Sequence, residues 1–200
     1  MKIADFTARL SATPLAAYAG AAPWAVTSKL EEIIAEAIAR LPSAYRASGD
    51  QAVHERATIE EGATLKGPLI IGPNAYVAKT AYLRGGVFVD ENCIVGPGAE
   101  LKTTIMLRGS KLAHLNFVGD SVLGEGVNIE AGAIIANYRN ERADKRVHFT
   151  YDGAAIDTGV EKFGAIVGDW ARIGANAVIA PGAALASGTI VPRLALVDLG

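Results

Sequence analysis

The sequence is poor in the residues that mark several common classes of protein. A single cysteine, Cys93, stands among 200 residues, so an internal disulfide framework is excluded and a reducing compartment is expected. Aromatic residues make up only 6% of the chain, which argues against a large aromatic core. The 19 lysines and arginines do not outnumber the 21 acidic residues, so no basic face for a nucleic-acid backbone is predicted.

Long apolar runs are missing as well. Asp5 and Arg9 interrupt the N-terminal stretch, and the alanine-rich run that follows is broken by Pro14, Gly20 and Pro23, so no signal peptide is expected. No segment approaches the roughly 18 apolar residues that a membrane span requires. These absences predict a cytoplasmic protein with neither membrane nor nucleic-acid partners.

A six-residue period dominates the chain after its first 50 residues. Aliphatic residues lead successive hexads, namely Val53, Ile59, Leu65, Ile71, Val77, Leu83, Val89, Val95, Leu101 and Leu107. The fifth position of a hexad is usually small, often alanine, and 22 glycines suit many tight corners. This pattern predicts a mainly β fold, a left-handed parallel β-helix in which three hexads complete a coil.

Two interruptions break the period. The next leading residues are Phe117, Leu123, Ile129 and Ile135, which predicts that four extra residues bulge out within residues 111–116. A charge-rich segment, residues 139–160, then predicts an inserted loop. The repeat resumes with Val167, Ile173, Ile179, Leu185 and Val191, which gives nineteen hexads, or about six coils.

The first 50 residues lack the period and are predicted to form a helical segment. Ser28-Lys29-Leu30-Glu31 has the spacing of a capping box, and apolar residues at helical spacing follow, so a helix is expected over residues 29–41. One interpretation is a cap over the first open coil; another is an interface with a partner. The predicted domains are therefore a helical cap over residues 1–50 and the β-helix over residues 51–200.

Arg84 and Lys102 are separated by 18 residues, one coil, and should stack in adjacent coils. Two stacked cations favour a bound phosphate or carboxylate between them. Glu100 could neutralise Lys102 instead, and a solvated basic face is the remaining reading.

His114 lies inside the first interruption and could be a general base near neutral pH. A hydrogen-bonded corner histidine is the simpler interpretation. Because His54 and His148 are far away in sequence and no His-x4-His pair exists, no metal site is expected.

Several short motifs resemble one known family. Residues 101–137 contain Ser110-Lys111, Ala113-His114-Leu115, Val118-Gly119-Asp120, Val127-Asn128-Ile129 and Ala131-Gly132. This stretch resembles the C-terminal acetyltransferase domain of bacterial bifunctional glucosamine-1-phosphate acetyltransferase/N-acetylglucosamine-1-phosphate uridylyltransferase, and the β-helix tails of sugar nucleotidyltransferases. The resemblance covers about residues 84–181.

The resemblance implies a set of roles. His114 would take a proton from a sugar amine as the amine attacks acetyl-CoA, and Glu100 would orient the imidazole. Arg84, Lys102 and Lys162 would hold the sugar phosphate. Asn128 and Asn137 would contact the sugar, and the backbone amide of Ala175 would face the thioester of the coenzyme. It also implies a homotrimer with sites shared between subunits.

The chain departs from the family at three positions of this stretch and its continuation. Phe117 replaces a tyrosine, Ala175 replaces a serine, and Glu130 replaces a glycine. This chain lacks the uridylyltransferase domain of the family, and the family has no counterpart of the insertion between Tyr138 and Lys162. One hypothesis is thus an acyl-CoA-dependent N-acyltransferase that acts on an amino-sugar phosphate or a nucleotide-linked amino sugar. The alternative is a non-catalytic β-helix module that trimerises and binds a sugar phosphate or nucleotide.

Overall fold

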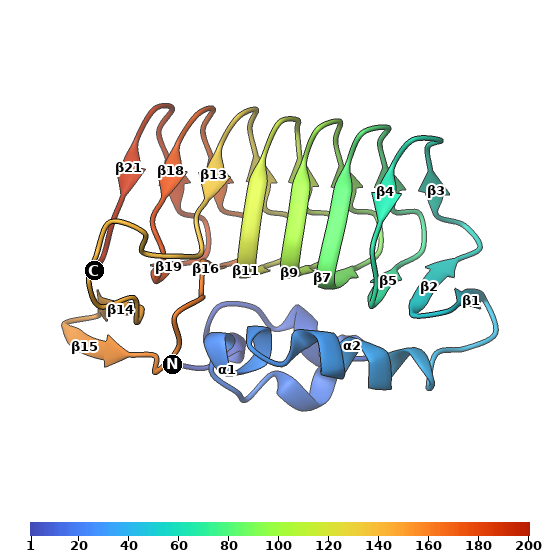
Figure 1. The fold of residues 1–200 in the computed structure, drawn as a ribbon, viewed down its shortest axis with the longest axis horizontal. Coiled ribbons are helices and arrows are strands. Elements are labelled where there is room, and N and C mark those ends of the chain that lie inside the picture. Colours follow the sequence, from blue (N-terminus) through green and yellow to red (C-terminus); the bar gives the residue numbers. More distant parts are fainter.

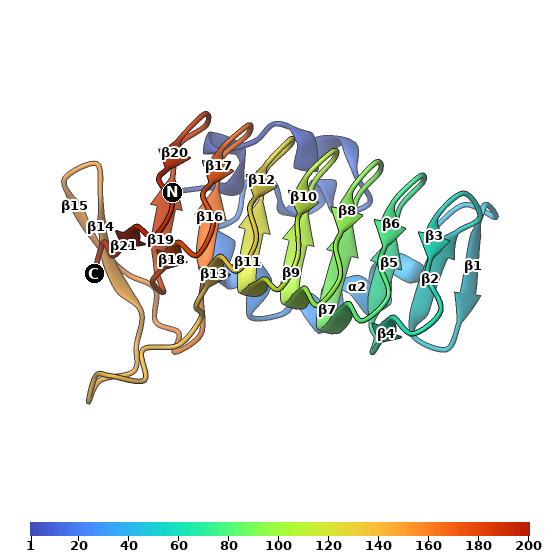
Figure 2. The same cartoon turned by 90° about the horizontal axis from the view of Figure 1, so that it is seen from above.

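The computed structural model describes residues 1–200, and most of them wind into a parallel β-helix with three faces (Figures 1 and 2). Face I contains β4 (Thr64–Leu65), the first halves of β7 (Tyr82–Val89), β9 (Glu100–Met106) and β11 (Phe117–Leu123), then β13 (Ile134–Ile135), β18 (Val178–Ile179) and β21 (Leu196–Val197). Each strand pairs in parallel with its neighbours in adjacent coils.

The other two faces repeat this arrangement. Face II contains β2 (Gln51–His54), β5 (Leu69–Ile71), the second halves of β7, β9 and β11, then β16 (Ala165–Val167) and β19 (Ala183–Leu185). Face III contains β3 (Thr58–Ile59), β6 (Tyr76–Val77), β8 (Ile94–Val95), β10 (Lys111–Leu112), β12 (Asn128–Ile129), β17 (Arg172–Ile173) and β20 (Ile190–Val191). β1 (Tyr45–Ser48) precedes the first coil and pairs antiparallel with β2.

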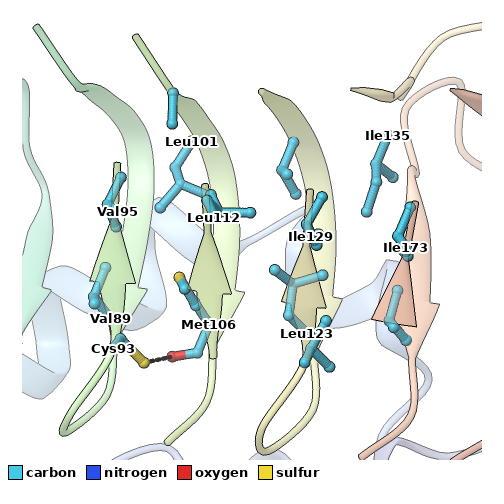
Figure 3. Close-up of a cluster of buried hydrophobic side chains, with 14 of the residues drawn as sticks. Val89, Cys93, Val95, Leu101, Met106, Leu112, Leu123, Ile129, Ile135 and Ile173 are labelled. Atoms are coloured by element: carbon cyan, nitrogen blue, oxygen red, sulfur yellow. Dashed lines mark hydrogen bonds between the residues drawn. The ribbon is translucent and has the colours of Figure 1, made fainter. Parts of the chain in front are cut away.

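One aliphatic residue of each strand points into the coil, as the period predicted. A cluster of 29 buried residues fills the interior, and part of it is shown in Figure 3. Cys93 belongs to it, and burial raises the pKa of its thiol to about 12, so the thiol is inert at neutral pH. The predicted fold class, a left-handed parallel β-helix, is confirmed.

The predicted four-residue bulge at residues 111–116 is wrong. Those residues form β10 and an ordinary corner, and β10 pairs in register with β8 and β12. The period instead shortens by one residue at two places, between Leu101 and Met106 and between Val118 and Leu123. Glu100 therefore pairs with Phe117 at a spacing of 17 residues instead of 18. The inward residues there are Met106, Leu112 and Val118, whereas Phe117 points outward and is half-buried. The 7-stranded sheet of face III also gives seven coils, one more than predicted.

The N-terminal segment lies along the flank of the β-helix, below the coils in Figure 1. It contains three 3-10 turns, η1 (Ile3–Asp5), η2 (Arg9–Ala12) and η3 (Ala16–Tyr18), followed by α1 (Pro23–Thr27) and α2 (Leu30–Ile38). The helix predicted over residues 29–41 is present but ends earlier. Its predicted capping box does not form, because the Ser28 hydroxyl donates to the carbonyl of Ala25.

These helices contact face II instead of closing the first coil. α2 packs on β5, β7 and β9, and α1 packs on β11. A second cluster of 21 buried residues joins them to outward-pointing residues of face II, namely Ala52, Ile70, Phe88, Ile105, Val122, Ile166 and Ala184. Both sides of face II are therefore apolar. Its inward side chains fill the interior of the coils, and its outward side chains are covered by the N-terminal segment. The division into domains at residue 50 remains a prediction.

The second interruption lies where the sequence placed it. It contains a hairpin of β14 (His148–Tyr151) and β15 (Ala154–Asp157), and it separates β13 on face I from β16 on face II. Phe149 of the hairpin packs near Trp24 and Phe163, so the insertion also contacts the N-terminal segment. No helix in the structure has the length and apolar character needed to cross a membrane.

Candidate functional site

Most of the predicted site residues lie along two edges of face I. We call the corner where face I turns into face II the I/II edge, and the corner where face III turns into face I the III/I edge. Arg84, Lys102, Asn137 and Lys162 lie at the I/II edge. His114 and Ala175 lie in corners of the III/I edge, which follow β10 and β17.

Arg84 and Lys102 are stacked in register on β7 and β9, as predicted. Each cation has its own carboxylate, however. Arg84 bonds Glu100 through Nε and Nη2 at 2.8 and 2.7 Å, and the Lys102 ammonium lies 2.7 Å from Asp120. The two protein carboxylates therefore offset the repulsion between the cations, and Glu100 neutralises Arg84 instead of Lys102.

Asp120 is the centre of the I/II edge. Its side chain is 7% exposed and accepts hydrogen bonds from the ammonium of Lys102 and the amide of Asn137. Its two partners, Lys102 and Asn137, line a pocket of about 580 Å³ together with Arg84, Phe117, Tyr138, Glu161 and Lys162. No carboxylate lies within 4.0 Å of the Lys162 ammonium, so this pocket holds a cation free to meet an anion.

His114 is exposed on the opposite edge of face I. Its carbonyl accepts a bond from the amide of Gly132 at 3.0 Å, and its imidazole makes no hydrogen bond within the chain. Glu100, whose predicted role is to orient this imidazole, bonds Arg84 instead. Within one chain, the imidazole is therefore accessible but is not held in position.

The backbone amide of Ala175 is occupied by the Glu130 carboxylate. The amide donates to Glu130 Oε2 at 2.8 Å, and the guanidinium of Arg193 holds the same carboxylate at 2.8 and 2.9 Å. The hydrogen bond from Arg193, followed by the one from Ala175, lowers the pKa of Glu130 below its usual value. The carboxylate thus stays ionised at neutral pH and blocks a donor that a thioester oxygen would need.

Asn128 does not join the I/II edge. It points outward from β12 on face III, next to a shallow pocket of about 270 Å³ that Glu130, Arg172 and Arg193 also line. The structure therefore separates the two asparagines that the resemblance grouped as sugar ligands.

Three groups at the site escaped the sequence reasoning. Asp120 belongs to the Val118-Gly119-Asp120 motif, but its contacts with Lys102 and Asn137 depend on coils of 17 residues, which the sequence did not predict. Glu161 follows a segment without period. Glu31, from the N-terminal segment, lies beside the I/II edge because of a helix position that no local pattern reveals. No group of three His, Cys, Asp or Glu side chains is placed to hold a metal ion.

Comparison with known proteins agrees with the motifs. The family model of the GMPPB C-terminal domain matches residues 65–139. A bifunctional sugar-1-phosphate nucleotidylyltransferase/acetyltransferase from Sulfurisphaera tokodaii is 32% identical over 134 residues, 67% of this chain and 33% of the relative. The bifunctional protein GlmU of Pseudarthrobacter chlorophenolicus is 40% identical over 113 residues, 55% of this chain and 22% of the relative.

A similar fold occurs in the crystal structure of a candidate acetyltransferase from Bacillus cereus. The TM-score is 0.50 at 15% identity, with 74% of this chain and 76% of the other covered. The chain spans only 22% and 33% of the two curated relatives named above. The resemblance read from the motifs is confirmed: the chain is a hexapeptide-repeat β-helix protein related to GlmU-type sugar-1-phosphate nucleotidyltransferases/acetyltransferases.

Proposed function

We propose that this chain is an acyl-CoA-dependent N-acyltransferase, with acetyl-CoA as the donor, that acts on an amino-sugar phosphate or a nucleotide-linked amino sugar. The observation that carries the proposal is the arrangement around face I, where a pocket with the unpaired Lys162 lies on one edge and the free imidazole of His114 on the other. The relatives, whose names include sugar-1-phosphate nucleotidyltransferase and acetyltransferase, favour the same chemistry.

The proposed reaction needs a base and an anion clamp. The amine of the sugar attacks the thioester carbonyl, a C–N bond forms, and the C–S bond of the thioester breaks. His114 accepts the proton that the amine loses and returns it to the departing thiolate. Lys162, with Arg84 and Lys102 beside it, holds the phosphate, while Asn137 contacts the sugar.

We propose further that the site is completed in a homotrimer. Exposed apolar residues run along face I and its III/I edge, namely Leu115, Ile134, Val178, Leu194 and Leu196, whose exposures range from 38% to 78%. Such a continuous stripe is typical of a surface covered by another subunit. A neighbouring copy laid on it would bring its I/II edge toward His114.

The test is thiol release from acetyl-CoA with a panel of amino-sugar phosphates and nucleotide-linked amino sugars. Because base catalysis contributes roughly 10²–10⁴-fold, His114→Ala should retain only residual turnover. His54→Ala is the control, since His54 lies on β2, away from face I. Full activity in His114→Ala would end the assignment of the base.

The alternative function, a non-catalytic module that trimerises and binds a sugar phosphate or nucleotide, draws on one specific observation. Glu130 and Arg193 occupy the Ala175 amide, where the resemblance places the thioester. Calorimetry with acetyl-CoA separates the two functions. Micromolar binding favours the transferase, whereas no binding at millimolar coenzyme favours the module.

A further inference from the structure

A second pocket lies on the other side of the Lys102 and Lys162 side chains. It has a volume of about 490 Å³, and one wall is formed by residues 27–32, where α1 ends and α2 begins. The opposite wall contains Thr103, Asp120 and residues 160–162. Because this pocket shares Lys102, Glu161 and Lys162 with the pocket at the I/II edge, one ligand can extend from one into the other.

A bulge in β7 positions the N-terminal wall. The pairing of β7 with β9 slips between Arg84 and Val87, so Gly85 and Gly86 both adopt positive φ angles, of 71° and 81°. A side-chain carbon at Gly86 would lie 2.7 Å from the backbone nitrogen of Glu31, and one at Gly85 would lie 3.4 Å from the Glu31 carboxylate. The two glycines therefore let the start of α2 dock directly beside the Arg84–Lys102 stack.

The charged side chains that face this pocket are largely unpaired. Lys29, Glu31, Glu32, Glu161 and Lys162 line it, and none of them forms an ion pair within the chain. Together with Asp120 and Lys102, which neutralise each other, the pocket carries three acidic residues against two free lysines. A second phosphate is thus disfavoured, whereas carboxylates and the hydroxyl of Thr103 are suitable partners for the hydroxyl groups of a sugar.

We infer that this second pocket binds the hydroxyl-rich sugar moiety of the acceptor, with Glu31 as a specificity-determining residue. The inference rests on the proposed function, because it takes the phosphate of the acceptor to lie at Lys162 in the neighbouring pocket. Its volume exceeds the lower limit of about 300 Å³ for small-molecule sites. The N-terminal segment is thereby a wall of the binding site in addition to a cover for face II.

The first test compares two probes by calorimetry on the full chain, glucosamine 1-phosphate and inorganic phosphate. We expect the sugar phosphate to bind at least about tenfold more tightly, since each charge-assisted hydrogen bond to a hydroxyl contributes about that much. Glu31→Gln should remove most of this difference and leave inorganic phosphate binding unchanged. Glu36→Gln, at an exposed position of the same helix, is the matched control.

The outcomes separate this inference from the proposed function. If the wild-type chain binds both probes equally, or if Glu31→Gln leaves their ratio unchanged, the sugar pocket is overturned while the anion site stands. If Lys162→Ala leaves the binding of both probes unchanged, the anion site itself fails and the inference fails with it.

A second variant tests the docking of the wall without removing a charge. In Gly86→Ala the added methyl group collides with the backbone of Glu31, so the start of α2 must shift and the preference for the sugar phosphate should fall about tenfold. Gly188→Ala is the control, because Gly188 has a similar φ of 73° with no atom near its missing side chain. Equal probe ratios in the two variants would contradict the role of the wall.

Discussion

Glu130 accepts the hydrogen bond of the backbone amide, that of Ala175, which the proposed coenzyme site would use. Glycine, the family residue at this position, would leave the Ala175 amide free and remove a negative charge from the III/I edge. We therefore predict that Glu130→Gly binds acetyl-CoA about tenfold more tightly than the wild type, the gain expected from restoring one hydrogen bond to a charged or polarised oxygen. Calorimetry at neutral pH measures this change.

Glu60 provides a matched control for that variant. It follows β3 as Glu130 follows β12, and its carboxylate accepts a hydrogen bond from the backbone of Lys79 in the next coil at 2.6 Å. Glu60→Gly removes the same corner contact several coils away, so acetyl-CoA affinity should not change. An equal affinity in Glu130→Gly and the wild type would mean that the coenzyme does not use the Ala175 amide.

The pair formed by Arg139 and Asp198 ties the last strand to the start of the insertion. The guanidinium of Arg139 is 1% exposed and donates to Asp198 at 2.6 and 2.9 Å and to the carbonyl of Pro181 at 2.6 Å. This hydrogen bonding lowers the pKa of Asp198. A lowered carboxyl pKa means that the stabilisation is present above the unfolded value of about 3.9 and is lost as the pH falls through the folded value.

We predict that Asp198→Asn lowers the free energy of unfolding at pH 7 by roughly 1–2 kcal/mol, because the buried guanidinium of Arg139 loses its charged partner while the amide oxygen of the new side chain can still accept a hydrogen bond. The difference from the wild type should shrink as the pH falls below about 4 and through the lowered pKa of Asp198. Urea unfolding at several pH values checks this, with Asp152→Asn, in the turn of the hairpin, as the control. A constant difference across that range would contradict the assigned ion pair.

At the scale of elements, Arg9 fastens the N-terminal segment to the β-helix. It donates to Asp90 at 2.7 and 3.1 Å and to Glu91 at 3.0 Å, and these carboxylates raise its pKa further above the usual value. Arg9→Ala leaves the nearly buried Asp90 without this partner, which should cost about 2 kcal/mol for the docked state. Cleavage within residues 1–38 under limited proteolysis should then rise roughly thirtyfold.

The control for that experiment is Arg40→Ala. Arg40 pairs only with Glu36, at 3.6 Å on the surface, so its removal should leave the cleavage rate unchanged. If Arg9→Ala is cleaved as slowly as the wild type, apolar packing alone holds the segment.

The β-helix itself could be predicted because its period is a local property of the sequence. The 17-residue length of the coil between Lys102 and Gly119 could not be predicted. Such a coil places Met106 and Val118 inward, but Leu107 and Phe117 fit the inward positions of an unbroken hexapeptide pattern equally well. Thr103 and Asp120 adopt positive φ angles of 50° and 47° at these shortened corners, which the sequence does not signal.

The position of the N-terminal helices did leave an unused signal. The residue that directly precedes each inward aliphatic residue points outward. On face II this residue is apolar in coil after coil, as at Ile70, Phe88 and Ile105, whereas on faces I and III it is polar or mixed. An outward position that stays apolar coil after coil must be covered, so this pattern identifies face II as the packing surface. The stacking of Arg84 on Lys102 was predictable from their spacing, whereas their carboxylate partners depend on corner geometry that the spacing does not fix.

At the scale of the whole molecule, the apolar stripe on face I predicts self-association. Val178, in the middle of the stripe, is 38% exposed, and Ile94, on face III, is 37% exposed. We predict that Val178→Asp converts the proposed trimer into a monomer in analytical ultracentrifugation, because a buried, unpaired carboxylate is costly at an interface. Ile94→Asp should stay trimeric. Dissociation of both variants, or of neither, would place the interface elsewhere.

A site shared between copies makes a quantitative prediction for mixtures. If each site combines His114 of one copy with Lys162 of the next, then His114→Ala and Lys162→Ala are each nearly inactive alone, yet every mixed trimer contains one site with both residues intact. Random assembly at equal amounts makes three quarters of the trimers mixed, so about a quarter of the wild-type sites should be restored. Thiol release after co-refolding measures this fraction.

A chain carrying both substitutions, mixed with wild type, is the control, because there each intact site requires two wild-type neighbours. Recovery is expected only if the two edges of face I that frame the site belong to different copies, and its absence in verified mixed trimers would assign both edges to one chain.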